Sequence, residues 1–304
     1  MHAWESIQKS VDYIEENLGS EIQIEELADI AALSVFYFQR LFTRLVKIPI
    51  REYIKLRRLA RACKSLENKD NRILDIAIEY GFGSHATFTK AFKEAYRITP
   101  TQYRESSVGL SHFDKPNLLL NYVMIDEGVP LISNGLVLEM NRKTLEVPID
   151  FLGVADYIPF ESGKMLGERP GVSKPSEIWD RLFKLIHNIP FTPSGRKIGV
   201  CYNGGAPAGY TTYFAGVEVE QDGGPSQFAS WQLPAREYVV CEFEAENFEA
   251  LTGSALGKAM KYTRFWLKKH GLIADGFFPE IYYQTSTAYM ELWIPFKKRE
   301  NINV

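Results

Sequence analysis

Apolar residues recur at three- and four-residue spacing in two adjacent stretches near the start of the chain, 24–31 and 38–45. The apolar positions are Ile24, Leu27, Ala28 and Ala31 in the first stretch and Phe38, Leu41, Phe42 and Leu45 in the second. This spacing predicts two short amphipathic helices. Ser34 is a good N-terminal cap for the second helix, which places a turn at residues 32–34. The pattern predicts a helix-turn-helix unit.

The other face of the second helix carries Phe36, Gln39 and Arg40 at positions i, i+3 and i+4. This face has no apolar partner in the pattern, so it is available to enter a DNA groove. Paired amphipathic helices also occur as plain structure, so one such unit is weak support for DNA binding.

The chain repeats this pattern 50 residues later, in 73–103. The matching pairs are Ser34 and Ser84, Phe38 and Phe88, Arg40 and Lys90, Phe42 and Phe92, Ile48 and Ile98, and Tyr53 and Tyr103. Before the turn the offset is 49, so one residue is added between Gly81 and Gly83. Residues 50–67 contain no Pro or Gly and predict one joining helix of about 27 Å. That length suits two readers in successive major grooves, roughly 34 Å apart.

The formal net charge of the chain is −3, but the charges are unevenly distributed. Residues 1–33 carry one basic and eight acidic side chains, whereas residues 34–64 carry nine basic and one acidic, a net charge of +8. A basic block over a predicted reading helix and spacer favours binding to DNA phosphates. We find neither a membrane-length apolar run nor a charged-then-apolar leader, so we expect a cytoplasmic protein without a membrane partner.

The second half of the chain alternates strands and helices, and its order is duplicated. The first repeat is predicted as strand 145–157, helix 176–188, and strands 197–202 and 210–218; the second as strand 237–243, helix 248–270, and strands 280–284 and 289–295. Two such units predict an antiparallel sheet with helices on one face and a concave face left for a ligand. The domains are therefore predicted as all-α 1–107, a linker 108–135, and α+β 136–304. Strand-like apolar runs are expected at 118–125 in the linker and at 136–140 as an entry strand of the second domain.

The first domain resembles the DNA-binding domain of the AraC family of bacterial transcription regulators. The resemblance rests on the duplicated helix-turn-helix, the joining helix and the segment IAIEYGFGSHATFTKAFKEAYRITPTQYR, and it covers roughly residues 5–105. It implies a homeodomain-like fold and base-reaching residues on both reading helices. The implied DNA-binding residues are Phe36, Gln39, Arg40, His85, Ala86, Thr87, Thr89 and Lys90, and we add Arg44 from the basic block. Ala86 departs from the polar residue often found there, so the second unit is expected to read sequence less sharply.

The second domain resembles the GyrI-like effector-binding domain, through the duplicated order and the closing EIYYQTSTAYMELWIPFKK. The resemblance implies a pocket-facing glutamate on a late strand, which we assign to Glu280, with Glu291 as second choice. A carboxylate among aromatic rings attracts a cation through its charge and through the ring faces. The expected wall is Tyr157, Trp179, Tyr202, Tyr282 and Trp293, with Phe160 and Tyr238 as further candidates. Each aromatic residue taken alone is more often core than ligand contact.

The sequence shows no catalytic constellation. Its three cysteines and five histidines lack metal-ligand spacing, so neither a metal site nor a cofactor is expected, and the protein is predicted not to be an enzyme. The leading interpretation is a regulator that binds double-stranded promoter DNA, responds to an amphiphilic or cationic small molecule, and contacts RNA polymerase. Two alternatives stay open for the second domain. One is a small-molecule hydrolase that uses Glu280 and a tyrosine, as some relatives of this module imply, and the other is a protein-interaction module.

Overall fold

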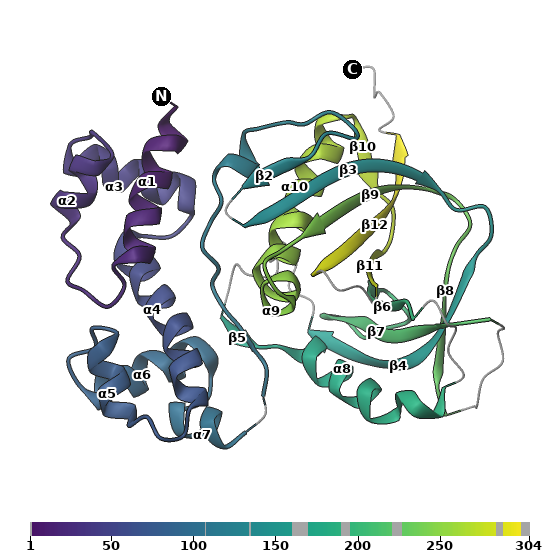
Figure 1. Cartoon of the computed structure of the whole chain (residues 1–304), viewed down its shortest axis with the longest axis horizontal. Coiled ribbons are helices and arrows are strands. Elements are labelled where there is room, and N and C mark those ends of the chain that lie inside the picture. Colours follow the sequence, from purple (N-terminus) through teal and green to yellow (C-terminus); the bar gives the residue numbers. More distant parts are fainter. Residues whose placement is uncertain are drawn as a thin grey trace. The chain divides into compact units, whose positions relative to one another are not determined.

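A computed structural model describes residues 2–106, 108–133, 135–159, 170–189, 195–220, 227–283 and 288–298. The chain forms two compact units, and each is described by itself (Figure 1). Unit 1 comprises Met1–Tyr122 and Leu166–Ser173, and unit 2 comprises Val123–Met165 and Lys174–Val304.

Unit 1 is built from helices, as its sequence predicts. They are α1 (Ala3–Glu16), α2 (Ile24–Ile30), α3 (Val35–Val46), α4 (Ile50–Glu67), α5 (Ile73–Glu79), α6 (His85–Tyr96) and α7 (Pro100–Glu105). The pairs α2–α3 and α5–α6 are the two helix-turn-helix units, and α4 joins them, with α2 and α3 towards one end of it and α5 and α6 towards the other (Figure 1).

The two helix-turn-helix units share the same local hydrogen bonding. Ser34 caps α3 by accepting the backbone N–H of Tyr37 at 3.4 Å, and Ser84 caps α6 by accepting that of Thr87 at 3.1 Å. Lys47 and Arg97, which are 50 residues apart, end α3 and α6 in the left-handed conformation. The repeat in the sequence is therefore a repeat in backbone geometry, down to the caps.

Each helix-turn-helix has its own apolar core. The first core gathers residues of α1–α4 together with Phe113 and Leu118, and its fully buried aromatic side chains are Phe38, Phe42 and Tyr53. The second gathers residues of α4–α6, and its largest side chains are Phe88, Phe92 and Tyr96. Helix α4 contributes to both cores, so its exposed side chains lie on the surface between the two helix-turn-helix units.

The stretch predicted as a linker, 108–135, does not behave as one. Phe113 and Leu118 are buried in the first core, and Leu118 donates its N–H to the Gln8 side chain at 2.8 Å. The strand-like run at 118–125 contains a 3₁₀ turn, Leu119–Asn121, directly after the buried Leu118. Strand β1 (Leu110–Ser111) pairs with β5 (Gly171–Val172), which also belongs to unit 1.

The rest of that stretch belongs to unit 2. The backbone N–H of Ile125 donates to the Tyr262 hydroxyl at 3.1 Å, and Trp266 donates to the Ile125 carbonyl at 3.0 Å. Residues on either side of Tyr122 therefore pack into different units, which leaves little free linker.

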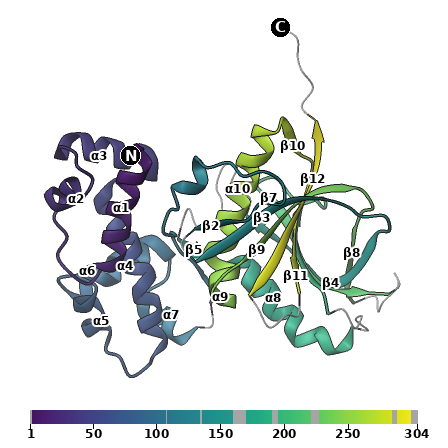
Figure 2. The ribbon, with the colours of Figure 1, turned by 45° about the horizontal axis from the view of Figure 1, so that its top comes forward.

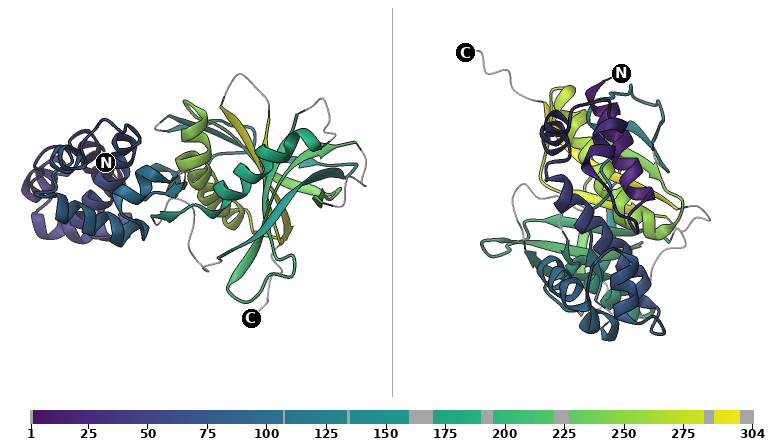
Figure 3. Two further views of the ribbon diagram at one scale, coloured as in Figure 1. Left: turned by 90° about the horizontal axis from the view of Figure 1, so that it is seen from below. Right: turned by 90° about the vertical axis from the view of Figure 1, so that its left-hand side faces the viewer.

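Unit 2 is an antiparallel sheet with helices on one face (Figures 2 and 3). Its strands are β2 (Leu131–Ser133), β3 (Leu136–Thr144), β4 (Ile149–Pro159), β6 (Lys197–Tyr202), β7 (Tyr210–Val219), β8 (Ala229–Leu233), β9 (Glu237–Glu244), β10 (Leu272–Ala274), β11 (Phe278–Tyr282) and β12 (Tyr289–Lys298). The strand order is β2-β3-β9-β12-β11-β6-β7-β4-β8, and β10 pairs with β12. The two predicted repeats correspond to β4-α8-β6-β7 and β9-α10-β11-β12, so the predicted α+β fold is confirmed.

The helices of unit 2 are α8 (Lys174–Leu185), followed by a 3₁₀ turn Ile186–Asn188, and α9 (Phe248–Ala250), which runs through a π-helical segment Leu251–Ala255 into α10 (Leu256–Lys269). Helix α8 packs on β4 and β7 through Ile178 and Leu182. Helix α10 packs beside β9 and β10, and its Thr263 contacts Met140 of β3. The pattern does not predict β8 or β10, which are short strands at the margins of the sheet.

Candidate DNA-reading surface and effector site

The predicted reading face of α3 is exposed. Phe36 has 69% of its surface accessible, and Gln39, Arg40 and Arg44 are exposed as well. The opposite face of the helix is buried through Phe38, Phe42 and Val46. The Arg40 guanidinium carbon lies 5.6 Å from the centre of the Phe36 ring, a cation–π contact that orients the charge. This arrangement presents a donor able to read guanine next to an apolar ring.

The corresponding face of α6 is more neutral. His85, Ala86, Thr87 and Lys90 are exposed, but the Thr87 hydroxyl lies 2.9 Å from the capping hydroxyl of Ser84 and is occupied by that bond. Thr89 is half-buried, and its hydroxyl oxygen is buried without a hydrogen-bond partner among the described residues. Thr89 therefore offers its hydroxyl poorly, and Lys90 is the strongest donor of this face.

In unit 2, Glu280 on β11 is the buried carboxylate of the predicted effector site. It is 4% exposed, and its Oε2 accepts hydrogen bonds from the Tyr282 hydroxyl at 2.8 Å and the Tyr213 hydroxyl at 3.3 Å. Burial raises the pKa of Glu280 from its ordinary 4.5 to about 7, and the two tyrosine hydrogen bonds lower it only in part. Among the residues that the structure describes, no lysine or arginine pairs with this carboxylate. When Glu280 is ionised, its negative charge is therefore not balanced by a cationic side chain among these residues.

The surroundings of Glu280 are arranged by three strands and a helix. Trp179 of α8 donates its indole N–H to the Tyr213 hydroxyl at 2.9 Å, which fixes the tyrosine that points at Glu280. Gly199 on β6 leaves room for these groups, because a Cβ there would lie 2.3 Å from the Tyr213 hydroxyl and 3.0 Å from the Glu280 carboxylate. Tyr213 and Gly199 are site residues that the sequence does not single out, since they reach Glu280 only through the strand register.

Aromatic rings continue from this carboxylate towards the surface. Trp179 and Tyr282 meet edge to face with ring centres 5.1 Å apart, Phe183 lies 5.6 Å from Trp179, and Phe248 lies 6.4 Å from Tyr282. Phe183 is 50% exposed and Phe248 is 62% exposed, although both are large apolar side chains. The Glu280 site is therefore a buried acid flanked by rings that lead outward.

Glu291 on β12 is a different kind of group. Its Oε1 accepts from the Lys143 ammonium at 2.8 Å and the Tyr289 hydroxyl at 2.7 Å. Its Oε2 accepts from the Tyr283 hydroxyl and the Trp293 indole N–H, both at 2.7 Å. Burial acts to raise the pKa of Glu291, but the hydrogen bonds from Lys143, Tyr283 and Tyr289 outweigh it and the pKa lies below 4.5. Glu291 therefore already has four hydrogen-bond donors on its two oxygens.

The two carboxylates lie on opposite faces of the sheet. Glu280 pairs with Leu292 and Glu291 pairs with Ile281 in the register of β11 and β12, and directly paired residues share a face. Because Glu280 contacts Tyr213 and is therefore on the side covered by α8, its site is not the helix-free face that the sequence predicts for the ligand. The predicted ligand face and the predicted ligand residue Glu280 therefore lie on opposite faces of the sheet, because strand alternation does not say which side the helices cover.

The aromatic residues predicted to line the ligand site are accordingly divided between the two faces of the sheet. Trp179 and Tyr282 lie at Glu280, whereas Trp293 contacts Glu291 and packs with Tyr202 and Tyr238 on the other face. Tyr157 pairs with Thr212, as does Tyr202, so it shares that other face, and it is 49% exposed. Phe160 lies outside the described residues.

Among the described residues, no group of three or more His, Cys, Asp or Glu side chains is placed to hold a metal ion. Burial raises the pKa of Cys201, next to Glu280, to about 12, so its thiol stays protonated at neutral pH. Within the same residues, none of the helices combines the length and the apolar character that crossing a bilayer requires.

Two exposed, capped reading helices joined by α4 define a DNA-binding protein, and the second unit adds a sheet with a buried acidic site. Comparison with protein families agrees for both parts. Residues 27–106 match the family model described as a helix-turn-helix domain, and residues 163–297 match the GyrI-like small molecule binding domain.

Named relatives match the first unit. The protein from Proteus vulgaris named as the probable transcription factor PqrA is 44% identical over 85 residues, which are 28% of this chain and 70% of that protein. The HTH-type transcriptional regulator YbfP of Bacillus subtilis is 38% identical over 104 residues, 34% of this chain but only 35% of YbfP. A solved regulator with an AraC-type DNA-binding domain from Chromobacterium violaceum is 24% identical, with a TM-score of 0.32 over 33% of this chain and 90% of that one.

The chain belongs to the AraC family of transcription regulators, and its second domain is a GyrI-like small-molecule binding domain. The family resemblance found in the sequence is confirmed for both domains. The named relatives are regulators of transcription rather than enzymes, which agrees with the prediction that this protein is not an enzyme.

Proposed function

We propose that this protein reads promoter DNA with α3 and α6 and changes its DNA affinity when an amphiphilic cation binds at Glu280. The single observation that supports the ligand class is a buried carboxylate with a raised pKa, two tyrosine hydroxyls and no described cationic partner. A lipophilic cation supplies the missing charge and fills the aromatic surroundings, which together repay the cost of an ionised buried acid.

For the DNA contacts, we propose an unequal division of labour. Arg40, oriented by Phe36, and Gln39 have the geometry to read base edges, whereas the face of α6 offers Lys90 and a small Ala86. The first helix-turn-helix then carries most of the sequence discrimination, and the second helix-turn-helix contributes backbone and shape contacts. A regulator placed in this way at a promoter is also positioned to contact RNA polymerase.

The DNA part is tested with a duplex selected from a random pool by the wild-type protein. We expect Arg40→Ala to cost about 1 to 3 kcal/mol of affinity for that duplex, and to relax its preference over scrambled DNA. Lys90→Ala is the matched comparison, and it should weaken both duplexes alike. Equal preference in wild type and Arg40→Ala would reject the assignment of Arg40.

The ligand part is tested by calorimetric titration with benzyltrimethylammonium and with its uncharged isostere, neopentylbenzene. Wild type should prefer the cation, and Glu280→Gln should remove that preference while it keeps the shape of the site. Glu291→Gln is the control for a buried carboxylate lost elsewhere in the sheet. A cation preference that survives in Glu280→Gln would show that another group binds the charge.

A further inference from the structure

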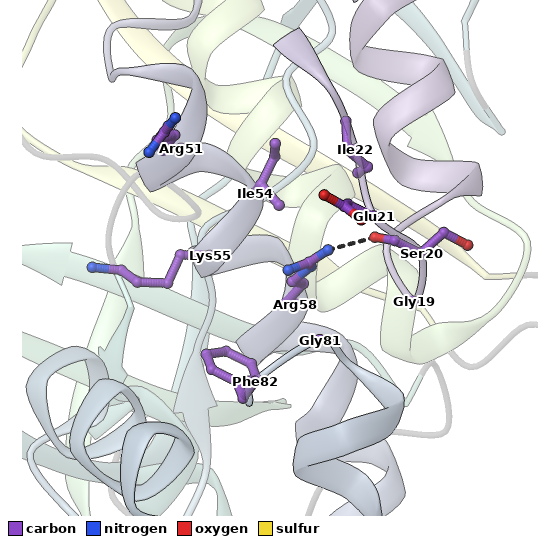
Figure 4. Close-up of a pocket in the computed structure, with 10 residues that line it drawn as sticks. All are labelled: Gly19, Ser20, Glu21, Ile22, Arg51, Ile54, Lys55, Arg58, Gly81 and Phe82. Carbon is purple, nitrogen blue, oxygen red and sulfur yellow. Dashed lines mark hydrogen bonds between the residues drawn. The ribbon is translucent and has the colours of Figure 1, made fainter. Parts of the chain in front are cut away.

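A hollow of about 400 Å³ lies in unit 1 between the two helix-turn-helix units (Figure 4). It is bounded by the segment that leads into α2, by one face of α4, and by the turn that precedes α6. The residues that form it are 19–22, Arg51, Ile54, Lys55, Arg58, Gly81 and Phe82. The hollow thus touches parts of both readers and the helix that spaces them.

Arg58 is a lining residue of this hollow whose positive charge is held in place. Its Nε donates to the Leu18 carbonyl at 2.8 Å, and its Nη2 donates to the Ser20 carbonyl at 2.6 Å, which Figure 4 shows as a dashed line. Gly81 lies against the guanidinium, since a Cβ there would be 2.7 Å from Nη1, and its φ of +72° also favours glycine. The guanidinium is therefore held between the two helix-turn-helix units. The carbonyls of Leu18 and Ser20 accept its hydrogen bonds on one side, and Gly81 packs against it on the other.

Arg51 and Lys55 place two further charges above Arg58 on the same face of α4. Positions 51, 55 and 58 follow i, i+4 and i+7 spacing, so their side chains form one stripe. Figure 4 shows Arg51 and Lys55 extending from the helix away from the 19–22 segment. The lining thus holds three basic side chains and one acidic one, Glu21.

Local acids offset this charge only weakly. Lys55 pairs with Glu52 at 2.7 Å, but both side chains are more than one-third exposed, and such pairs are readily exchanged for a stronger anion. Glu21 accepts a hydrogen bond from Gln23 at 2.6 Å, which draws part of its charge away from the arginines. The hollow keeps a net positive character and is wide enough for a phosphate group.

We propose that this hollow binds phosphates of the DNA backbone between the two major grooves that α3 and α6 enter. The inference rests on the DNA binding of the two helix-turn-helix units. A duplex read in successive major grooves must pass its intervening backbone across the chain that joins the readers. Arg51 and Lys55 contact the phosphates, and Arg58 supports them with a fixed charge below.

The test is the salt dependence of binding to the selected duplex, between 50 and 200 mM salt. Removing one phosphate contact lowers the slope of log affinity against log salt by about 1, which is roughly a 3- to 4-fold smaller loss of affinity over this range. We expect this for Lys55→Gln and again for Arg51→Gln, with equal weakening of selected and scrambled duplexes. Both side chains are accessible, so the variants should melt like wild type.

The matched control is Lys64→Gln, which makes the same charge change on the same helix. Position 64 is nine residues from Lys55, about 180° around α4, and it is exposed. An unchanged slope for Lys64→Gln with reduced slopes for the other two supports the site. Equal slopes for Lys55→Gln and Lys64→Gln would overturn it, whereas the proposed reading role of Arg40 stands or falls separately on sequence preference.

Discussion

Glu280 and Glu291 are glutamates on neighbouring strands of one sheet and are almost equally buried. They differ in the number of hydrogen-bond donors around them and in the direction in which their pKa is shifted. Glu291 accepts hydrogen bonds from an ammonium, two tyrosines and an indole, and its pKa is lowered. Glu280 has two tyrosine donors on one oxygen, and its pKa is raised to about 7. The difference teaches that two equally buried glutamates can differ in the number of partners they already have, and our proposal that Glu280 binds the ligand depends on that difference.

The largest expected effect is on stability, for Glu291→Ala. Loss of this acid leaves the Tyr283 hydroxyl and the Trp293 indole N–H without their acceptor, and Lys143 and Tyr289 keep only Glu242. Breaking a buried hydrogen-bonded ion pair in this way costs about 3 kcal/mol or more. Glu280→Ala should cost distinctly less, because it strands only two hydroxyls and removes an acid whose ionisation is disfavoured by burial. Urea unfolding of both variants at pH 8 measures the contrast, and equal losses would contradict it.

The second prediction concerns pH, where the two acids act with opposite sign. The folded-state pKa of Glu280 is raised from 4.5 to about 7, so its contribution to stability is fully present below pH 4.5 and is lost as pH rises to about 7. The loss reaches up to about 3 kcal/mol, and Glu280→Gln should abolish it. Glu291, with a lowered pKa, contributes stability above its ordinary pKa that is lost as pH falls.

Urea unfolding at intervals from pH 4.5 to 8 measures this, as the difference between wild type and Glu280→Gln. Taking the difference cancels the other carboxylates of the chain. A difference that does not change with pH would mean that Glu280 is ionised normally, and would remove the electrostatic reason for a cation at this site.

Gly199→Ala should have a smaller effect, confined to the Glu280 side. The new methyl would lie 2.3 Å from the Tyr213 hydroxyl, so the tyrosine must shift, at a cost of about 1 to 3 kcal/mol. Cation binding should weaken with it, whereas the hydrogen bonds of Glu291 stay in place on the other face. Thermal unfolding and titration with benzyltrimethylammonium check the two consequences, and unchanged cation binding would argue against Tyr213 as a site residue.

The smallest expected difference between two variants comes from a matched pair of tryptophan substitutions. Trp293→Phe removes a donor to a charged oxygen, a bond worth about 1.5 to 3 kcal/mol, whereas Trp179→Phe removes a donor to the Tyr213 hydroxyl, worth about 0.5 to 1.5 kcal/mol. Unfolding free energies should therefore fall more for Trp293→Phe. The reverse order would show that Glu291 is less charged than its partners imply.

Much of this architecture is predictable from local patterns. The helix-turn-helix units are marked by 3.6-residue periodicity and by the caps Ser34 and Ser84, because caps and periodicity are local properties. In unit 2, the prediction of strand 197–202 agrees with β6.

What local patterns miss is long-range. Tyr213 and Gly199 reach Glu280 through the register of β7, β6 and β11, which no local pattern contains. The choice of face for Glu280 depends on where α8 packs, and the burial of Phe113 depends on a core assembled from distant helices. The packing of Leu118 in that core is missed for the same reason, since a segment broken by prolines and polar residues can still dock on a preformed surface.

The measurement that tests the account at its centre is the effect of benzyltrimethylammonium on affinity for the selected duplex, in wild type, Glu280→Gln and Glu291→Gln. The account predicts a change of at least about fivefold in wild type and in Glu291→Gln, and none in Glu280→Gln. A response of equal size in Glu280→Gln, or no response in wild type at concentrations that saturate the second domain, would contradict it.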